Sequence, residues 1–491
     1  MKKKFLALAL LALSAASLSA CGPSDEPGPN PTPTPSGDHF IDTPTTITVW
    51  TTAGDTSQAI LNRWVEEFKE IEPNVTVTNV KQSGGYDDLL NMIITGFTGN
   101  NYPDLAYCYP DHVADYIDYG KAVQLDKYID NEEYGWTAEE KADFIPAYLE
   151  EGQQYTVEGT WSLPFSKSTE ALFYNADILL GLDLSGTKAG KDINGGAALN
   201  EKYLANLTWE ELFDHLAPAL LEYDQTIDNI IEPCDDGITR VFGYDSDDNL
   251  FITLARQYGL PYTDVENGKG VIEFNTPEMK ELLLKFRDAY QKGYFITKGT
   301  NEDNYVNELF TANQLLFSVG STGGLTYQFS DENPIDVGVA MIPQAGGENA
   351  TPSTIMQGPS MCILDHNDEN RKLAAWLFYK YITGADQTLE WGMNGTGYFP
   401  IRESNYEDPV YLEAADVELY DEQTLEILQA RALQFFPTMQ STLFTSPAFK
   451  GSSTARVQAG GLFTQALLSD GTSATIDKLF ADAESASNLA L

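Results

Sequence analysis

The sequence contains few basic residues for its length. Lys and Arg number 29 against 73 Asp and Glu, which gives a formal charge of −44. A field of this sign repels nucleic acid and anionic lipid, so it argues against both as binding surfaces. It also disfavours a phosphate-bearing ligand, although a local pocket can override the field of the whole molecule.

The common catalytic and metal-binding motifs are missing. The four histidines form no H-E-x-x-H pattern, and the chain contains neither G-x-S-x-G nor a P-loop. Residues 245–249 begin like a calcium loop, but Leu250 and Arg256 replace its Gly and Glu, so we expect a solvated loop. We therefore expect no metal, no cofactor and no enzymatic activity. The alternative is a secreted glycoside hydrolase, which needs only two carboxylates.

Cysteine is rare, and the first of the four cysteines lies in a secretion signal. Three lysines at positions 2–4 precede an apolar run at 5–13 that is too short to span a bilayer. Residues 18–21 (Leu-Ser-Ala-Cys) resemble the bacterial lipoprotein signal, in which the cysteine is lipidated and begins the mature protein. We therefore expect residues 1–20 to be a signal peptide and Cys21 to carry the lipid. An ordinary secreted protein with an incidental cysteine is the alternative.

The other three cysteines are Cys108, Cys234 and Cys362. Their number is odd, so at least one thiol has no partner. Cys108 and Cys362 lie in apolar, strand-like runs, where a small buried thiol is expected. We expect no structural disulfide.

Apolar side chains are almost absent from residues 22–38, where proline alternates with small polar residues. Such a segment cannot offset the entropy of folding, so we expect residues 21–43 to form a disordered tether. At about 3 Å per residue, the tether holds the folded part up to roughly 50 Å from the membrane.

Strand and helix patterns alternate directly after the tether. Residues 46–51 and 75–80 are strand-like, and apolar residues repeat at helical spacing in 60–68 and 89–97. With a third strand-like run at 104–109, the order is β-α-β-α-β. This order predicts an α/β fold with a parallel sheet, right-handed crossovers and a ligand beyond the carboxyl ends of the strands.

Two later helices have clear start signals. Thr208 and Glu211 stand at capping-box spacing, and Thr276 with Pro277 opens a helix that Gly293 closes. A buried helix is expected at 373–382, and mostly helices after residue 402. Strands are expected at 240–243, 315–319, 336–342 and 358–364. Loops are expected at 180–206, 320–324 and 394–402.

Five motifs occur in a fixed order: YNADIL, LTWEEL, NELFTANQLLFSVGSTGG, AAWLFYKYITG and TGYFPIR. Together with Trp50 and the segment YPDLAY, they resemble the extracellular solute-binding proteins of bacterial ABC importers. The resemblance is to the large sugar-binding family that includes maltose-binding protein, and it runs from about residue 45 to the C-terminus. It implies a two-lobed periplasmic-binding-protein-like fold of type II, with a cleft that closes on the ligand.

The resemblance also implies how the chain divides. Each lobe is expected to be a mainly parallel sheet flanked by helices, with crossing segments near 166–172, 356–361 and just after 400–403. Lobe one would consist of residues 44–166 plus 357–402, and lobe two of residues 167–356 plus 403–491.

A receptor of this family implies a set of partners. We expect a monomer that is anchored by its lipid to the outer face of the cytoplasmic membrane. It would bind a mono- or oligosaccharide and deliver it to the permease subunits of an ABC importer, which a separate ATPase drives. Glycerol phosphate or another polyol is the alternative ligand.

A neutral sugar needs fixed donors and acceptors for its hydroxyls and aromatic rings for its C–H face. Asp55 and Tyr109 each have an alternative role, as a helix N-cap and as a core residue, and core packing is also the alternative for Tyr398. Glycines beside Ser321 and Thr322 would let the backbone approach a ligand. The candidate site residues are Asp55, Gln82, Tyr86, Tyr109, Asp111, Thr169, Tyr244, Ser321, Thr322, Asn394 and Tyr398.

Overall fold

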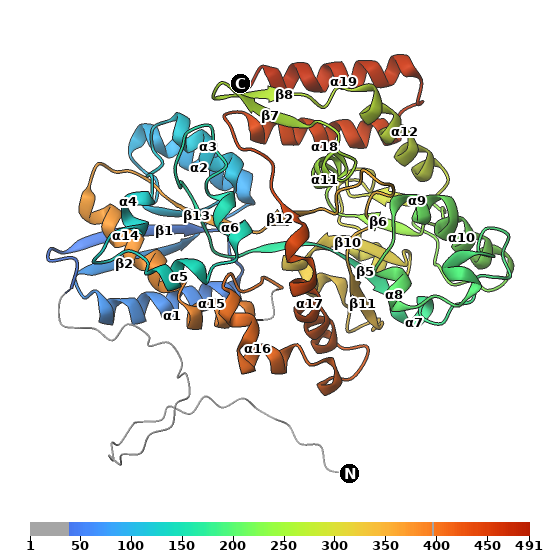
Figure 1. Cartoon of the computed structure of the whole chain (residues 1–491), viewed down its shortest axis with the longest axis horizontal. Helices are drawn as coiled ribbons and strands as arrows, with labels where there is room; N and C mark the ends of the chain where they lie inside the picture. Colours follow the sequence, from blue (N-terminus) through green and yellow to red (C-terminus); the bar gives the residue numbers. More distant parts are fainter. Residues whose placement is uncertain (1–38, 395–396) are drawn as a thin grey trace, which may run out of the picture. The chain divides into compact units, whose positions relative to one another are not determined.

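A computed structural model of the protein describes residues 39–394 and 397–491 (Figure 1). The predicted signal peptide, Cys21 and the tether up to position 38 lie outside the described residues. Within the described ranges, no helix combines the length and the apolar character needed to cross a membrane.

The first β-sheet has five strands in the order β2-β1-β3-β13-β4. The strands are β1 (Thr45–Thr51), β2 (Val75–Lys81), β3 (Leu105–Cys108), β4 (Leu163–Pro164) and β13 (Ser360–Ile363). β1 pairs parallel with β2 and β3, as the β-α-β-α-β order predicts, whereas β13 pairs antiparallel with β3 and β4. β13 enters from the second sheet, which explains its opposite direction.

Helices cover both faces of the first sheet; α2 and α3 lie above it in Figure 1 and α1 below it. α1 and α14 pack through Phe68 and Phe378, whose ring centroids lie 5.2 Å apart. The predicted helices at 60–68, 89–97 and 373–382 are confirmed, and they bury one core around Trp64, Leu89 and Trp376. The helices are α1 (Asp55–Ile71), α2 (Tyr86–Gly99), α3 (Pro110–Asp118), α4 (Asp126–Ile129), α5 (Ala138–Ala142), α6 (Pro146–Glu151), α14 (Glu369–Ile382) and α15 (Ala385–Gly392).

The second sheet has seven strands, in the order β14-β12-β5-β10-β6-β9 with β11 also paired to β5. The strands are β5 (Ser168–Asn175), β6 (Phe242–Tyr244), β9 (Phe295–Thr297), β10 (Phe317–Ser321), β11 (Val337–Ala340), β12 (Thr354–Gln357) and β14 (Leu443–Phe444). β5 is buried along its whole length and pairs antiparallel with β10, β11 and β12, while β6 pairs parallel with β9 and β10. The fold is therefore α/β as expected. Both sheets contain parallel and antiparallel strand pairs, however, whereas mainly parallel sheets were expected.

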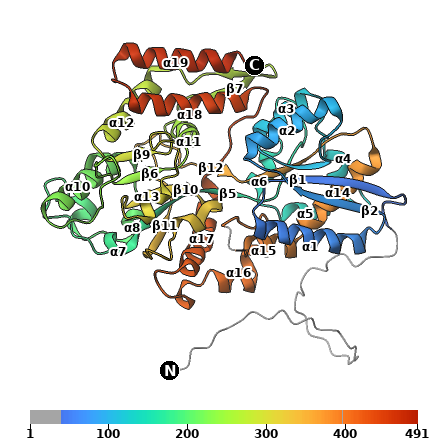
Figure 2. The same cartoon turned by 180° about the vertical axis from the view of Figure 1, so that it is seen from behind.

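The helices around the second sheet include the C-terminal pair α18 and α19 (Figure 2). They are α7 (Ala176–Leu179), α8 (Glu201–Leu204), α9 (Trp209–Glu211), the π-helical turn η2 (Leu212–Leu216), α10 (Ala217–Thr226), α11 (Asp247–Gln257), α12 (Pro277–Gln291), α13 (Asn307–Thr311), α16 (Pro409–Ala414), α17 (Leu425–Met439), α18 (Ser452–Leu468) and α19 (Ser473–Asn488). A separate hairpin joins β7 (Thr263–Glu266) to β8 (Lys269–Ile272).

Both predicted helix starts are confirmed by side-chain caps. Thr208 Oγ1 accepts from the backbone N–H of Glu211 at 3.1 Å, and Thr276 Oγ1 accepts from Met279 N–H at 3.2 Å. The carboxylate of Glu211 accepts instead from the hydroxyl of Tyr203 at 2.5 Å. Half of the predicted capping box is thus replaced by a tertiary contact.

Two loop predictions are wrong. β10 continues to Ser321, whose Oγ accepts from Gly323 N–H at 3.2 Å and begins the 3₁₀ helix η3 (Thr322–Gln328). The predicted solvated loop at 245–249 is half-buried apart from the buried Asn249, and its last three residues begin α11. There Asp247 Oδ1 accepts from the hydroxyl of Thr297 at 2.6 Å, which ties the start of α11 to β9.

The predicted surface loop at 180–206 is partly a core segment. It contains the 3₁₀ turn η1 (Ile193–Gly196) and helix α8, and Leu184 and Leu199 are buried in the core of the second sheet. The apolar residues of this segment anchor it to that core, although glycines lie between them. Cys108 and Cys362 are buried in β3 and β13, as expected, and among the described residues the cysteines are free thiols.

Candidate ligand-binding site

Arg456 on α18 is the centre of a polar cluster. Its Nε donates to Asp248 Oδ2 at 2.7 Å, and its Nη2 donates to Asn249 Oδ1. Burial opposes the charge on the guanidinium, but the neighbouring carboxylates of Asp248 and Asp111 outweigh burial and raise the pKa of Arg456. Arg456 is therefore a fixed cation held by acidic groups.

Asp111 connects this cluster to the first sheet. It lies in the first turn of α3, and Ser452 Oγ of α18 donates to its Oδ1 at 3.2 Å. Nearby, His112 Nε2 lies 3.5 Å from Asp87 Oδ1, and the contact with His112, followed by the charge of Arg456, lowers the pKa of Asp87. Arg456 thus pairs directly with Asp248 and interacts through charge with Asp111 and with Asp87, whose side chain is 78% exposed.

Tyr86, Tyr109 and Tyr398 form an aromatic group beside the cluster. The rings of Tyr86 and Tyr109 meet edge to face, with centroids 4.8 Å apart and an interplanar angle of 86°. Burial raises the pKa of Tyr86, and Tyr398 and Tyr109 raise it further. Tyr398 packs on Gly323, where an added Cβ would lie 2.9 Å from the ring. The structure therefore brings three predicted tyrosines from separate segments together.

Glu170 is a site residue that the sequence interpretation missed. It lies in β5 with 1% of its surface exposed, and burial raises its pKa to about 8. Tyr244 donates its hydroxyl to Glu170 Oε2, while Asn249 Nδ2 and Gln357 Nε2 donate to Oε1 at 3.0 and 3.3 Å. Asn249 thereby links Glu170 to Arg456. The signal for Glu170 was its charge directly before the apolar run 171–174 of the predicted crossing.

Tyr244, Thr169 and Thr322 are placed inside the protein. Tyr244 is completely buried and uses its hydroxyl on Glu170. Thr322 Oγ1 accepts from Thr169 N–H at 3.3 Å, and Thr169 Oγ1 donates to the carbonyl of Ile355 at 3.0 Å. The two threonines therefore hold β5 against its neighbours and face no solvent in this structure.

Ser321, Asp55, Gln82 and Asn394 lie at ends of secondary-structure elements. Ser321 Oγ lies 3.3 Å from Ser168 Oγ, and the half-buried Gln82 donates its backbone N–H to Thr51 O at 2.7 Å. Asn394 is half-buried just after α15.

Asp55 is the first residue of α1 and not its N-cap, which is Gly54, so the capping alternative is wrong. Its side chain is 98% exposed and accepts from Lys81 Nζ at 2.7 Å. That hydrogen bond lowers the pKa of Asp55.

A sequence profile described as bacterial extracellular solute-binding protein matches residues 63–418, which is well over half of the chain. The chain belongs to this family. The match includes β3, β5, β10, β13 and α11 and therefore most of the elements that carry the site.

Relatives of this solute-binding protein are distant. The sn-glycerol-3-phosphate-binding periplasmic protein UgpB of Yersinia enterocolitica is 24% identical over 254 residues, which is 50% of this chain and 50% of that protein. The match therefore spans only half the length of that relative.

Solved structures have the same two-lobed fold. The GacH receptor of Streptomyces glaucescens, solved unliganded and with acarbose, has a TM-score of 0.64 at 18% identity and covers 91% of this chain and 98% of its own. UgpB of Mycobacterium tuberculosis, solved with glycerophosphocholine, has the same TM-score, identity and coverage. At these identities the likeness shows the fold.

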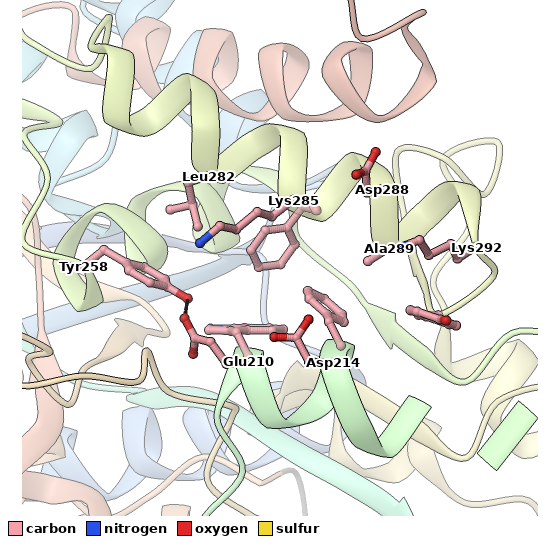
Figure 3. Close-up of a pocket in the computed structure, with 12 residues that line it drawn as sticks. Glu210, Asp214, Tyr258, Leu282, Lys285, Asp288, Ala289 and Lys292 are labelled. Atoms are coloured by element: carbon pink, nitrogen blue, oxygen red, sulfur yellow. Dashed lines mark hydrogen bonds between the residues drawn. The ribbon is translucent and has the colours of Figure 1, made fainter. Parts of the chain in front are cut away.

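Two cavities of this solute-binding protein lie away from the candidate site. One, of about 200 Å³, lies between η2 and α12 (Figure 3). Two polar side chains that line it already have hydrogen-bond partners. Glu210 accepts from Tyr258 and from Gly346 N–H, each at 2.9 Å, and Trp209 donates to Gln257. The other, of about 220 Å³, lies between η3, α16 and α17. Neither is lined by a predicted site residue.

Proposed function

We propose that this protein captures a mono- or oligosaccharide between its two lobes and delivers it to the permease of an ABC importer. The observation that carries the proposal is the group of Tyr86, Tyr109 and Tyr398 beside the Arg456 cluster. Aromatic rings suit the C–H face of a sugar, and carboxylates with a guanidinium suit its hydroxyls. We infer that the protein holds its solute without turning it over.

Glycerol phosphate or another polyol is the second candidate, because the relative from Yersinia is a glycerol-phosphate-binding protein. The charges around Arg456 favour the carbohydrate. A phosphate would have to replace Asp248, which already pairs with the guanidinium at 2.7 Å, and would face Asp87 and Asp111. Like charges repel, more strongly at Asp111, which is 9% exposed, than at Asp87, whose side chain is 78% exposed.

We place the lobes as predicted, at 44–166 plus 357–402 and at 167–356 plus 403–491. Support for this division comes from the two places where the chain changes sheet, between β4 and β5 and between β12 and β13. We infer that the lobes open and close about these crossings, so that the measured affinity includes the cost of closure.

A glycan panel tests the proposal. At a ligand concentration 100 times Kd, binding stabilises the folded state by about 2.7 kcal/mol, which corresponds to a rise in Tm of about 3 °C for a folded part of this size. We expect this shift with maltotriose or another oligosaccharide of the panel, together with a smaller radius of gyration in X-ray scattering. A larger shift with sn-glycerol 3-phosphate, or release of shorter sugars, would contradict the carbohydrate-binding function.

We also propose that Cys21 carries a lipid and that residues 1–20 are removed as a signal peptide, which places the receptor on the outer face of the cytoplasmic membrane. Cys21→Ser is expected to move the protein from the membrane fraction to the soluble fraction and to leave its glycan affinity unchanged. Fractionation followed by calorimetry measures both properties. Retention of the variant in membranes would refute the lipid anchor.

A further inference from the structure

Lys167 is a fully buried lysine at the junction of the segments that connect the two sheets. It lies between β4 and β5 and has 0% of its surface exposed. Its Nζ donates to Glu151 Oε2 at 2.7 Å and to the carbonyl of Gly358 at 3.0 Å. Its own carbonyl accepts from Phe399 N–H at 2.8 Å. Lys167 thus lies in the first predicted crossing, contacts the second at Gly358 and pairs with Phe399, which comes shortly before the third.

Glu151 fixes this junction to the first sheet. It ends α6 and is also buried, and its Oε2 accepts a second hydrogen bond, from Ser360 Oγ of β13, at 2.7 Å. The aromatic ring of Tyr148 lies below the ammonium group, with its centroid 5.7 Å from Nζ. We call Glu151, Lys167, Gly358, Ser360 and Phe399 the hinge node.

Gly358 brings the first two crossings into backbone contact. Its φ of +78° lies in the left-handed region that favours glycine. A Cβ at this position would lie 2.0 Å from the carbonyl oxygen of Ser166 and 3.0 Å from the Cα of Lys167. Any larger residue would push the crossings apart, so the Lys167 hydrogen bond to Gly358 depends on the glycine.

Stability alone does not account for the buried pair. Replacing a buried ion pair with apolar residues of similar size is often neutral or stabilising, because both charges must be desolvated. What an ammonium group provides here is three directed donors, which meet Glu151, Gly358 and, at 3.5 Å, the hydroxyl of Ser360. The geometry therefore specifies an arrangement of the crossings.

We propose that Lys167 is a positioning residue that fastens the crossing segments together and so restricts the relative rotation of the lobes. The inference rests on the proposed function, in which closure of the lobes accompanies ligand capture. A restricted hinge limits the open conformations that the ligand-free protein samples. Closure then costs less conformational entropy, so binding is stronger although Lys167 does not contact the ligand.

The test removes both charges, so that neither is left buried alone. Lys167→Met with Glu151→Leu is compared with Lys280→Met with Asp477→Leu, a partly exposed ion pair of 2.8 Å that joins α12 to α19 within one lobe. Glu70→Cys and Glu281→Cys, in a Cys21→Ser background, carry nitroxide labels on α1 and α12. Pulsed electron paramagnetic resonance then measures the distribution of distances between the two labels, and so between the lobes, in the ligand-free protein.

We expect the hinge-node variant to keep its Tm within a few degrees while the distance distribution becomes at least twice as wide. Its affinity for the oligosaccharide that gives the largest thermal shift should fall about tenfold. The control pair should change neither quantity. An unchanged distribution in a folded hinge-node variant would overturn the proposal.

If the double variant does not fold, Ser360→Ala is the deciding variant, because it keeps both charges and removes only the hydrogen bonds of one hydroxyl, to Glu151 and to Lys167. It should widen the distribution to a smaller extent, and no widening would again overturn the proposal. Since the distances are measured without ligand, they test the hinge node even if no oligosaccharide binds, an outcome that would refute the proposed function instead.

Discussion

Arg456→Gln is expected to weaken oligosaccharide binding about 100-fold. The change leaves Asp248 and Asp111 without their shared cation and releases Asn249, which Arg456 holds through Nη2. The side chain of Arg456 is 28% exposed, so each of its two hydrogen bonds contributes about 1.5 kcal/mol, and each 1.4 kcal/mol is a factor of ten in affinity. Titration calorimetry with the oligosaccharide that gives the largest thermal shift measures the loss.

Arg256→Gln provides the matched control for Arg456. Arg256 is exposed in the last turn of α11, where it lies over the ring of Phe444. Its loss changes the net charge of the protein by the same amount, so any effect of the overall field appears in both variants. Equal affinities of the two variants would show that Arg456 does not belong to the binding site.

Glu170→Gln is expected to remove part of the pH dependence of stability. Burial raises the pKa of Glu170 from 4.5 to about 8. Between these values the folded protein retains a proton that the unfolded chain has lost, so stability falls as pH rises through this window. Glutamine has no proton to lose, and the variant should lack this decline, which amounts to a few kcal/mol because each pKa unit is about 1.4 kcal/mol.

Urea unfolding at pH 5, 7 and 9 measures this effect as the difference between variant and wild type. Asp245, whose pKa burial raises to about 7, contributes to both proteins and cancels in the difference. Glu66→Gln, at an exposed position of α1, is the control and should leave the pH profile unchanged. A constant difference between the Glu170 variant and wild type across the three pH values would contradict the assignment.

The hydrogen bonds of Glu170 favour its charged form, and burial outweighs them to favour the neutral form. As a carboxylate it accepts from Tyr244, Asn249 and Gln357, and Gln357 Oε1 has no hydrogen-bond partner among the described residues. Protonated Glu170 can donate to that oxygen if the amide is turned by 180°, an orientation that hydrogen bonding has to decide. This turn places Nε2 where Oε1 had no partner, so one unpaired atom replaces another, and burial remains the reason for the raised pKa.

The sequence by itself determined the elements whose signals are local. The α/β order, the caps at Thr208 and Thr276 and the buried helix α14 depend on residues a few positions apart, and they appear where they were predicted. The strand ends likewise placed Tyr86 and Tyr109 correctly side by side. The predicted lipid at Cys21 lies outside the described residues.

The tertiary structure decided which polar groups have distant partners. Arg456 meets Asp248 and Asn249 more than 200 positions away in the chain, and Lys167 meets Gly358 across 191 positions. Burial turned Tyr244 and Thr169 inward and made Glu170 a site residue, because a buried polar group must find a partner wherever the fold provides one. Hydrophobic periodicity and motif spacing cannot reveal such pairs, because the partners come together only when the two sheets are joined in the folded protein.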